Sequence, residues 1–309
     1  MSPSRGKAVA IALFAAALAA AGCGIGPGAD VGAVTLTVTR DYGAQRLLGP
    51  ETEAASESDT AMRLLDRSAD ISTRYGGGFV SSIEGLSEAV RDGRRYDWFF
   101  YVDGVESPVG AADYALRGGE SIWWDYRDWS AAERVPAVVG SWPQPFRDGY
   151  EGKRPATVVE CLGGGRACGE VRTRLAAAGA RLSGDAAGAL RVLVGPWTRV
   201  REDPAAAQIE EGPQASGVFA DFTPAGAGSY TLQGLDEGGG EARRFGPGAG
   251  LVAATRRYEA PPVWIVSGST RRGVSAAAAA LDVGALRDRY AVAVEAGRAT
   301  PLPIGAPAP

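Results

Sequence analysis

The sequence predicts an α+β protein in which a small, β-rich domain precedes an α/β domain with a mixed sheet. In residues 33–129, short runs with a period of two surround one helical stretch. In residues 156–300, strand-like runs alternate with helical ones. The segment between them, residues 130–155, is rich in proline and carries Trp142, Phe146 and Tyr150, which indicates a linker or a segment that docks the two domains.

The composition excludes several classes of function. The formal charge is -4, so neither nucleic acid nor an acidic membrane surface is indicated as a partner. The sequence contains no histidine, which excludes Ser-His-Asp triads and the common histidine-containing zinc sites. All but two of the 32 basic residues are arginine, which is typical of a GC-rich genome and is not read as a binding signal.

The N-terminus predicts export and a lipid anchor. Arg5 and Lys7 precede an apolar, alanine-rich run, residues 8–21, that is shorter than the roughly 20 residues of a spanning helix. Small residues and then Cys23 follow, which resembles the lipobox of bacterial lipoproteins. We therefore expect a signal peptide at 1–22, a lipidated Cys23 and a tether at 23–32. A plain signal peptide and an uncleaved anchor are the alternatives, and each version places the folded part outside the cytoplasm.

The first domain is predicted to hold one helix among four or five strands. Val34, Leu36 and Val38 alternate with threonines, which is typical of a half-buried strand. The polar stretch from Gly49 to Asp59 is expected to be a loop, and Asp59 or Ser58 is expected to cap a helix up to Ala69. Strands are then expected at three further places, the second of them ending in a hairpin turn at residues 103–104. These strands are residues 79–83, 96–102 and 121–126.

Four ordered blocks of the first domain carry a resemblance to a known family. The blocks are residues 75–86, 98–104, 110–116 and 118–126. Together they resemble the transcobalamin-like C-terminal domain family, so the resemblance covers roughly residues 33–129. It implies a β-grasp-like, ligand-binding domain of exported lipoproteins, with cobalamin as a possible ligand. The animal carriers also have a helical barrel that encloses the corrinoid, and no part of this sequence resembles that barrel.

Aromatic density marks the candidate ligand-binding residues of this domain. Five of the seven tryptophans lie between Trp98 and Trp142. On the last strand Ile122, Trp124 and Tyr126 must face away from Trp123 and Asp125. One set is expected to fill the core, and the other either to contact a ligand or to dock the second domain. The candidate ligand contacts are Tyr75, Gly77, Gly78, Tyr101 and Trp123.

The second domain, residues 156–300, resembles no family that we recognise. Its expected strands are residues 156–160, 190–194, 217–222, 229–235, 251–258, 263–266 and 291–295. Helices are expected at 168–178, 198–211 and 274–290, and a mobile loop at 238–250. A proline-rich tail, residues 301–309, is expected to be extended.

Two groups of residues in the second domain suggest chemistry. Cys161 and Cys168 flank a glycine run and are expected to form a disulfide in an oxidising compartment, with a metal site or a redox pair as alternatives. The same glycines, residues 163–165, could hold an anion with Arg166. Residues 267–269, with the arginines at 271–272, could likewise hold an anion or expose a serine nucleophile.

These observations favour a non-enzymatic, lipid-anchored binding protein on the extracytoplasmic face. Its partners would be the membrane, through the anchor, and a corrinoid or another small ligand that it presents to an uptake system. Two alternatives stay open: an interaction module for protein or cell-wall glycan, and an enzyme in the second domain.

Overall fold

The computed structural model of this chain describes residues 28–305. The predicted signal peptide, Cys23 and the first half of the expected tether, up to residue 27, lie outside the described residues, as does the end of the tail after residue 305. Residues 30–32 of the expected tether already belong to the first strand, β1 (Asp30–Arg40). Within residues 28–305, no helix is long and apolar enough to cross a membrane. Helices and strands are both present, and the sheets are antiparallel or mixed, so the α+β class is confirmed.

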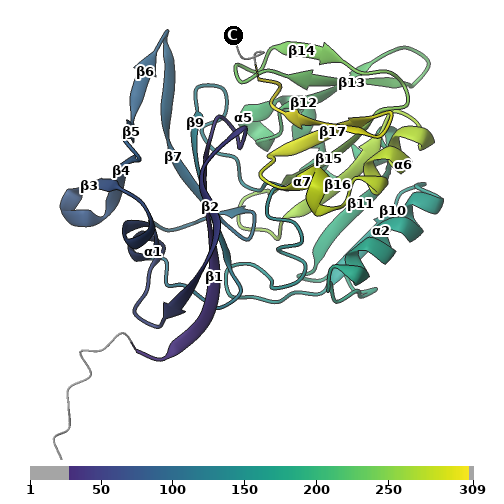
Figure 1. The fold of residues 1–309 in the computed structure, drawn as a ribbon. Helices are drawn as coiled ribbons and strands as arrows, with labels where there is room; N and C mark the ends of the chain where they lie inside the picture. The colour runs from purple at the N-terminus through teal and green to yellow at the C-terminus, as the bar shows by residue number, and fades with distance from the viewer. Residues whose placement is uncertain (1–27, 306–309) are drawn as a thin grey trace, which may run out of the picture.

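The first domain is built on a twisted sheet with the strand order β2-β1-β9-β7-β6, and β8 extends it beside β7 (Figure 1). Its strands are β1 (Asp30–Arg40), β2 (Gln45–Ser56), β6 (Ala89–Arg91), β7 (Arg94–Val102), β8 (Val105–Glu106) and β9 (Ser121–Asp128). One face carries helix α1 (Ala61–Ser68) and a small sheet made of β3 (Ile71–Arg74), β4 (Phe79–Ile83) and β5 (Leu86–Ser87). The short helix η1 (Tyr75–Gly77) connects β3 to β4.

Alternation along the strands divides the side chains of this sheet between two cores. Val34, Leu36 and Val38 of β1 face α1, together with Ile122 and Trp124 of β9. Helix α1 buries Met62, Leu64 and Leu65 in the same cluster. The residues between them on the strands face the second domain instead.

Two predictions for the first domain are wrong in detail. The stretch from Gly49 to Asp59, expected as a loop, lies mostly in β2, which pairs antiparallel with β1. β2 is an edge strand whose side chains are mostly exposed, so backbone pairing forms it without an apolar pattern. Helix α1 is capped by Thr60, whose Oγ1 accepts a hydrogen bond from the Arg63 N–H, and not by Asp59 or Ser58.

The second domain contains the predicted mixed sheet, with the strand order β10-β11-β16-β15-β17-β18. The first three strands are mutually parallel, and the others pair antiparallel. The strands are β10 (Thr157–Cys161), β11 (Leu190–Pro196), β15 (Gly250–Thr255), β16 (Val263–Gly268), β17 (Ala291–Glu295) and β18 (Arg298–Leu302).

Both faces of this sheet are covered. Helices α2 (Arg166–Ala177) and α6 (Arg271–Ala279) bury their apolar sides on one face. Short helices and a three-stranded sheet cover the other face. These elements are α3 (Trp197–Val200), α4 (Pro204–Ala207), η2 (Gln208–Glu211), α5 (Pro213–Ser216), β12 (Ala220–Pro224), β13 (Tyr230–Leu235) and β14 (Glu241–Arg244).

Several predicted elements of this domain are interrupted. The helix expected at 198–211 is broken, because Asp203 caps a new helix that has Pro204 in its first turn. The helix expected at 274–290 ends with α6, and Asp282 caps the separate helix α7 (Val283–Leu286). The loop expected at 238–250 contains β14, and the first residues of the expected tail belong to β18.

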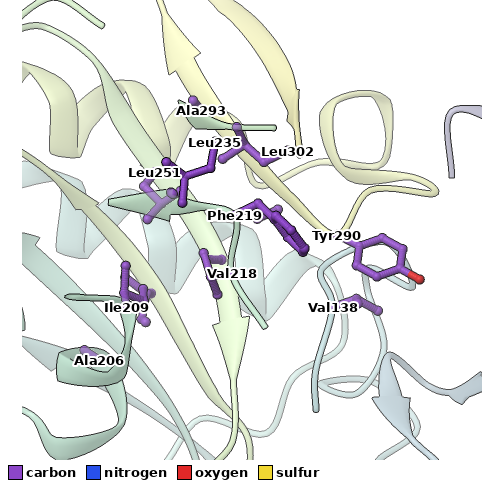
Figure 2. Packing of buried hydrophobic residues seen from close by; sticks show 14 of the residues in the cluster. Val138, Ala206, Ile209, Val218, Phe219, Leu235, Leu251, Tyr290, Ala293 and Leu302 are labelled. Carbon is purple, nitrogen blue, oxygen red and sulfur yellow. The ribbon is translucent and has the colours of Figure 1, made fainter. Parts of the chain in front are cut away.

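A continuous core joins the two domains. It contains Tyr42 and Trp123 from the first domain together with Phe219 and Tyr290 from the second. Figure 2 shows Phe219 and Tyr290 near Val138, which belongs to the segment 130–155. In the same segment Trp142 and Phe146 pack on Trp264, with ring centroids 5.8 and 4.8 Å apart. The segment is therefore part of the packing between the domains.

Candidate functional site

A pocket of about 200 Å³ opens in the first domain, mostly on the face of the sheet that carries α1 and β4, and its lining also includes Phe99, which packs on the core of the other face. It lies beside β7, at residues 98–100, where β7 is paired with neither β6 nor β8. Its walls come from α1, β4, β7, β9 and the loop that follows β8. The aromatic lining residues are Phe79, Trp98, Phe99, Phe100 and Trp124.

Stacked aromatic rings form one wall of this pocket. The rings of Phe100 and Trp124 are stacked with their centroids 4.8 Å apart, because the two residues are direct partners on neighbouring strands. Trp98 is fixed by a hydrogen bond from its Nε1–H to the Leu86 carbonyl, at 2.8 Å. The Trp124 Nε1 is buried and has no hydrogen-bond partner among the described residues. The wall is thus preformed, and it is almost wholly apolar.

The glycine turn before β4 leads into the lining of the pocket at Gly78 and Phe79. Gly76 and Gly77 have φ values of 70° and 95°, which glycine adopts without strain. This turn brings Tyr75, which is 88% exposed, within 6.4 Å of the ring of Phe79, which is 39% exposed. Gly78 itself lines the pocket. Two exposed aromatic side chains therefore stand beside the opening.

Glu106 is the one ionisable residue that lines the pocket within the described chain. Its Oε2 accepts a hydrogen bond from the Nε–H of Arg134 at 2.9 Å, and that arginine side chain is 67% exposed. Burial raises the pKa of Glu106, against the opposing effect of the Arg134 charge. Arg127 also lowers the pKa of this carboxyl, so burial outweighs the effect of two arginines.

The structure divides the five candidate ligand contacts into two groups. Gly78 lines the pocket, and Tyr75 and Gly77 belong to η1, the turn directly before it. Tyr101 and Trp123 lie on the opposite face of the sheet, with exposures of 0% and 2%, inside the core between the domains. Their expected role in contacting a ligand is therefore corrected: they dock the second domain, which is the alternative that the sequence left open.

Strand alternation explains both this correction and the residues that were missed. Tyr101 follows Phe100, and Trp123 precedes Trp124, so the two pairs point to opposite faces. The sequence identified the two faces but not which of them a second domain covers. Met62, Phe79, Trp98, Phe100 and Trp124 were consequently not assigned to the pocket, although the aromatic alternation was the signal that could have found them.

A buried polar network occupies the face that docks the second domain. The Asp125 carboxylate accepts hydrogen bonds from the Thr39 hydroxyl at 2.5 Å, the Gly43 N–H at 3.0 Å and the Tyr290 hydroxyl at 3.0 Å. Burial raises the pKa of Asp125 to about 6. Arg127 is also fully buried, and it donates to the backbone carbonyls of residues 128, 132 and 133. This network connects the domains, and its Arg127 stacks on the ring of Phe99, a residue that lines the aromatic pocket.

The second-domain candidates are held by structural contacts. Cys161 and Cys168 lie at disulfide distance, with their Cα atoms 5.9 Å apart. Gly164 is buried between them, and a Cβ there would lie 2.9 Å from the Val194 carbonyl oxygen, so close packing accounts for this glycine. Ser267 is fully buried and donates to the Gly195 carbonyl at 2.9 Å, so its hydroxyl is not exposed as a nucleophile. Within residues 28–305, no three Cys, Asp or Glu side chains are grouped to hold a metal ion.

A larger cavity of about 750 Å³ lies in the second domain, between α6, α7 and the hairpin of β17 and β18. Its walls are mostly alanine and glycine, and its two carboxylates already have structural partners. Asp282 accepts from the Ala285 N–H at 3.0 Å. Glu295 accepts from the Gly246 N–H at 2.7 Å and from Arg243 at 3.0 Å. Neither carboxylate is placed as a free acid or base.

Comparison with protein families gives one match, and it coincides with the pocket. Residues 58–128 match the model of a family described as Domain of unknown function (DUF4430). The matched segment runs from just before α1 to the end of β9, and so includes every residue that lines the aromatic pocket. No curated protein matches the chain.

Proposed function

We propose that this chain is a lipid-anchored, extracytoplasmic binding protein that takes up a small ligand in the aromatic pocket of its first domain. The observation that carries the proposal is the pocket itself, a preformed and mostly apolar recess within the DUF4430 segment. The leader sequence that ends at Cys23 supports the anchor and the location. Metabolic labelling with palmitate should mark the full chain and should not mark the Cys23→Ser variant.

Binding is favoured over catalysis by the chemistry available at the two cavities. The sequence has no histidine, and the aromatic pocket is lined by a single ionisable residue, Glu106. The carboxylates of the larger cavity are engaged in capping and in loop contacts. General acid–base catalysis needs groups that can reach a substrate, and these groups are already bonded.

The resemblance of residues 33–129 to transcobalamin-like domains supports a corrinoid as one ligand. A corrinoid is far larger than 200 Å³, and drug-sized ligands already occupy pockets of about 300–1,000 Å³. In this version of the proposal the macrocycle lies against Tyr75 and Phe79, and only a substituent enters the pocket.

A titration of the full chain in mild detergent with cyanocobalamin tests this version. We expect saturable quenching of tryptophan fluorescence at micromolar cyanocobalamin. The affinity should fall at least about fivefold in Tyr75→Ala, because stacking of one planar group on an aromatic side chain contributes about 1–3 kcal/mol. The matched control is Tyr258→Ala, because Tyr258 is 86% exposed but lies in the second domain. Quenching that does not saturate, or that Tyr258→Ala weakens equally, would remove the corrinoid version.

A second candidate function is recognition of protein or cell-wall glycan. The exposed pair Tyr75 and Phe79 favours it, because exposed aromatic side chains beside a recess are typical of interaction surfaces. Sedimentation of the protein with purified cell wall, lost in Tyr75→Ala and retained in Tyr258→Ala, would support this function over the first.

A further inference from the structure

We propose that the group held in the aromatic pocket is a small alkylammonium cation, of the kind found in choline. This inference rests on the proposed binding function and specifies its ligand. The observations that carry it are the aromatic walls, the single lining carboxylate and the size of the pocket.

The walls offer the kind of surface that binds alkylated ammonium groups. Aromatic faces attract cations electrostatically, and quaternary ammonium groups are commonly recognised by clusters of such rings. Phe79, Trp98, Phe100 and Trp124 line the pocket, and all four lie on or beside the face of the sheet that carries α1. Neutral apolar groups would fit these walls too, so the charge of the lining decides between a cationic and a neutral ligand.

The charge of the lining favours a cation. No lysine or arginine lines the pocket, whereas Glu106 does. Its partner Arg134 is largely exposed, and screening by solvent makes such a pair weak. The charge of Arg127 also acts on Glu106, but its guanidinium is held below the Phe99 ring, 3.7 Å from the ring centroid, where it donates to the backbone carbonyls of residues 128, 132 and 133. A ligand cation would therefore compensate Glu106 from the pocket side.

The size of the pocket sets an upper limit on the group. A volume of about 200 Å³ lies below the roughly 300–1,000 Å³ of drug-sized sites, so the recess fits a small group. Choline has seven heavy atoms. Its carbon isostere, 3,3-dimethylbutan-1-ol, has the same shape without the charge, so the two compounds separate charge from shape.

Calorimetric titration of the full chain in detergent with these two compounds tests the inference. We expect choline to bind at least about tenfold more tightly than the isostere. Glu106→Gln should reduce this preference to within about threefold. Arg134→Gln should instead increase the affinity for choline, because it removes the competing cation, and loss of folding could not produce that result. Vesicles of phosphatidylcholine, compared with phosphatidylglycerol, distinguish a lipid headgroup from a free ammonium compound.

Three outcomes would overturn the inference. If the isostere binds as tightly as choline, the pocket selects shape alone, and the proposed binding function stands with a neutral ligand. If Glu106→Gln keeps the full preference for choline, the carboxylate is not the recognition group. If neither compound binds, the alkylammonium ligand is wrong, and the cyanocobalamin titration then decides separately whether the proposed binding function survives.

Discussion

At the scale of single residues, Asp125 is the clearest case of a polar group that the fold must accommodate. It lies in the core between the domains, where desolvation of a carboxylate is costly unless hydrogen bonds compensate it. Thr39 and Tyr290 supply two of these bonds, and the pKa of Asp125 is still raised to about 6 by burial. Desolvation therefore outweighs the hydrogen bonds.

The raised pKa gives a prediction with a definite sign. Between about pH 4 and pH 6 the folded chain keeps the Asp125 proton that the unfolded chain releases. The protonated Asp125 carboxyl stabilises the folded chain fully at a pH below the pKa that this carboxyl has in the unfolded chain. This stabilisation is lost as the pH rises through about 6. We expect the free energy of unfolding of the wild type, relative to Asp125→Asn, to fall by roughly 3 kcal/mol between about pH 4 and pH 7.

Urea unfolding at several pH values measures this difference. Asp185→Asn, on an exposed loop, is the control and should follow the wild type at every pH. A difference between wild type and Asp125→Asn that does not change with pH would show that this carboxyl is ionised alike in both states.

At the scale of elements, helix α2 and the loop before it show two opposite uses of glycine. Gly169 lies in the exposed interior of α2, and a Cβ there would meet no atom within 4 Å. Gly164, just before α2, is packed so that a Cβ would lie 2.9 Å from the Val194 oxygen and 3.0 Å from the Cys168 sulfur. The sequence alone shows the same residue type at both positions.

We therefore expect alanine to have opposite effects at these two sites. Gly169→Ala should raise the free energy of unfolding by about 0.5–1 kcal/mol, because alanine loses less backbone entropy in a helix. Gly164→Ala should lower it by about 1–3 kcal/mol through overpacking. Thermal and urea unfolding of the two variants check the signs, and the same sign in both would contradict the packing argument.

At the scale of the whole molecule, the two domains share one core. Trp123, Tyr42 and Tyr290 pack together, with centroids 4.9 Å apart between Tyr42 and Tyr290 and 5.4 Å apart between Trp123 and Tyr290. Because Trp123 and Trp124 are neighbours on β9, the second domain packs directly behind the strand that carries the pocket wall. This arrangement lets the second domain support the pocket wall, and every residue that lines the pocket comes from the first domain.

Gly140 tests how tightly this shared core is packed. A Cβ there would lie 2.6 Å from the Trp123 ring and 2.7 Å from the Arg289 nitrogen, so Gly140→Ala must push the domains apart locally. We expect it to lower the free energy of unfolding by about 1–3 kcal/mol. Gly184→Ala, at an open position, is the control and should change the stability by less than about 0.5 kcal/mol. Equal stability of Gly140→Ala and wild type would mean that the interface accommodates the added methyl group with no loss in the free energy of unfolding.

The sequence by itself determined the α+β class and the order of most strands. These follow from local pattern: alternation in 34–38, the turn at Asp103 and Gly104, and the alternating strands and helices after residue 156. Polar edge strands such as β2 could not be predicted from local pattern, because backbone pairing forms them without an apolar pattern.

Only the tertiary structure decided which aromatic face became the pocket. Alternation placed Trp123 and Trp124 on opposite sides of β9, and each side carries a tryptophan that could line a pocket or a domain contact. The second domain covers the face of Trp123 and Tyr101, and this leaves the face of Trp124 and Phe100 to line the recess. The decision depends on contacts between residues more than 150 positions apart, such as Asp125 with Tyr290, which local patterns do not encode.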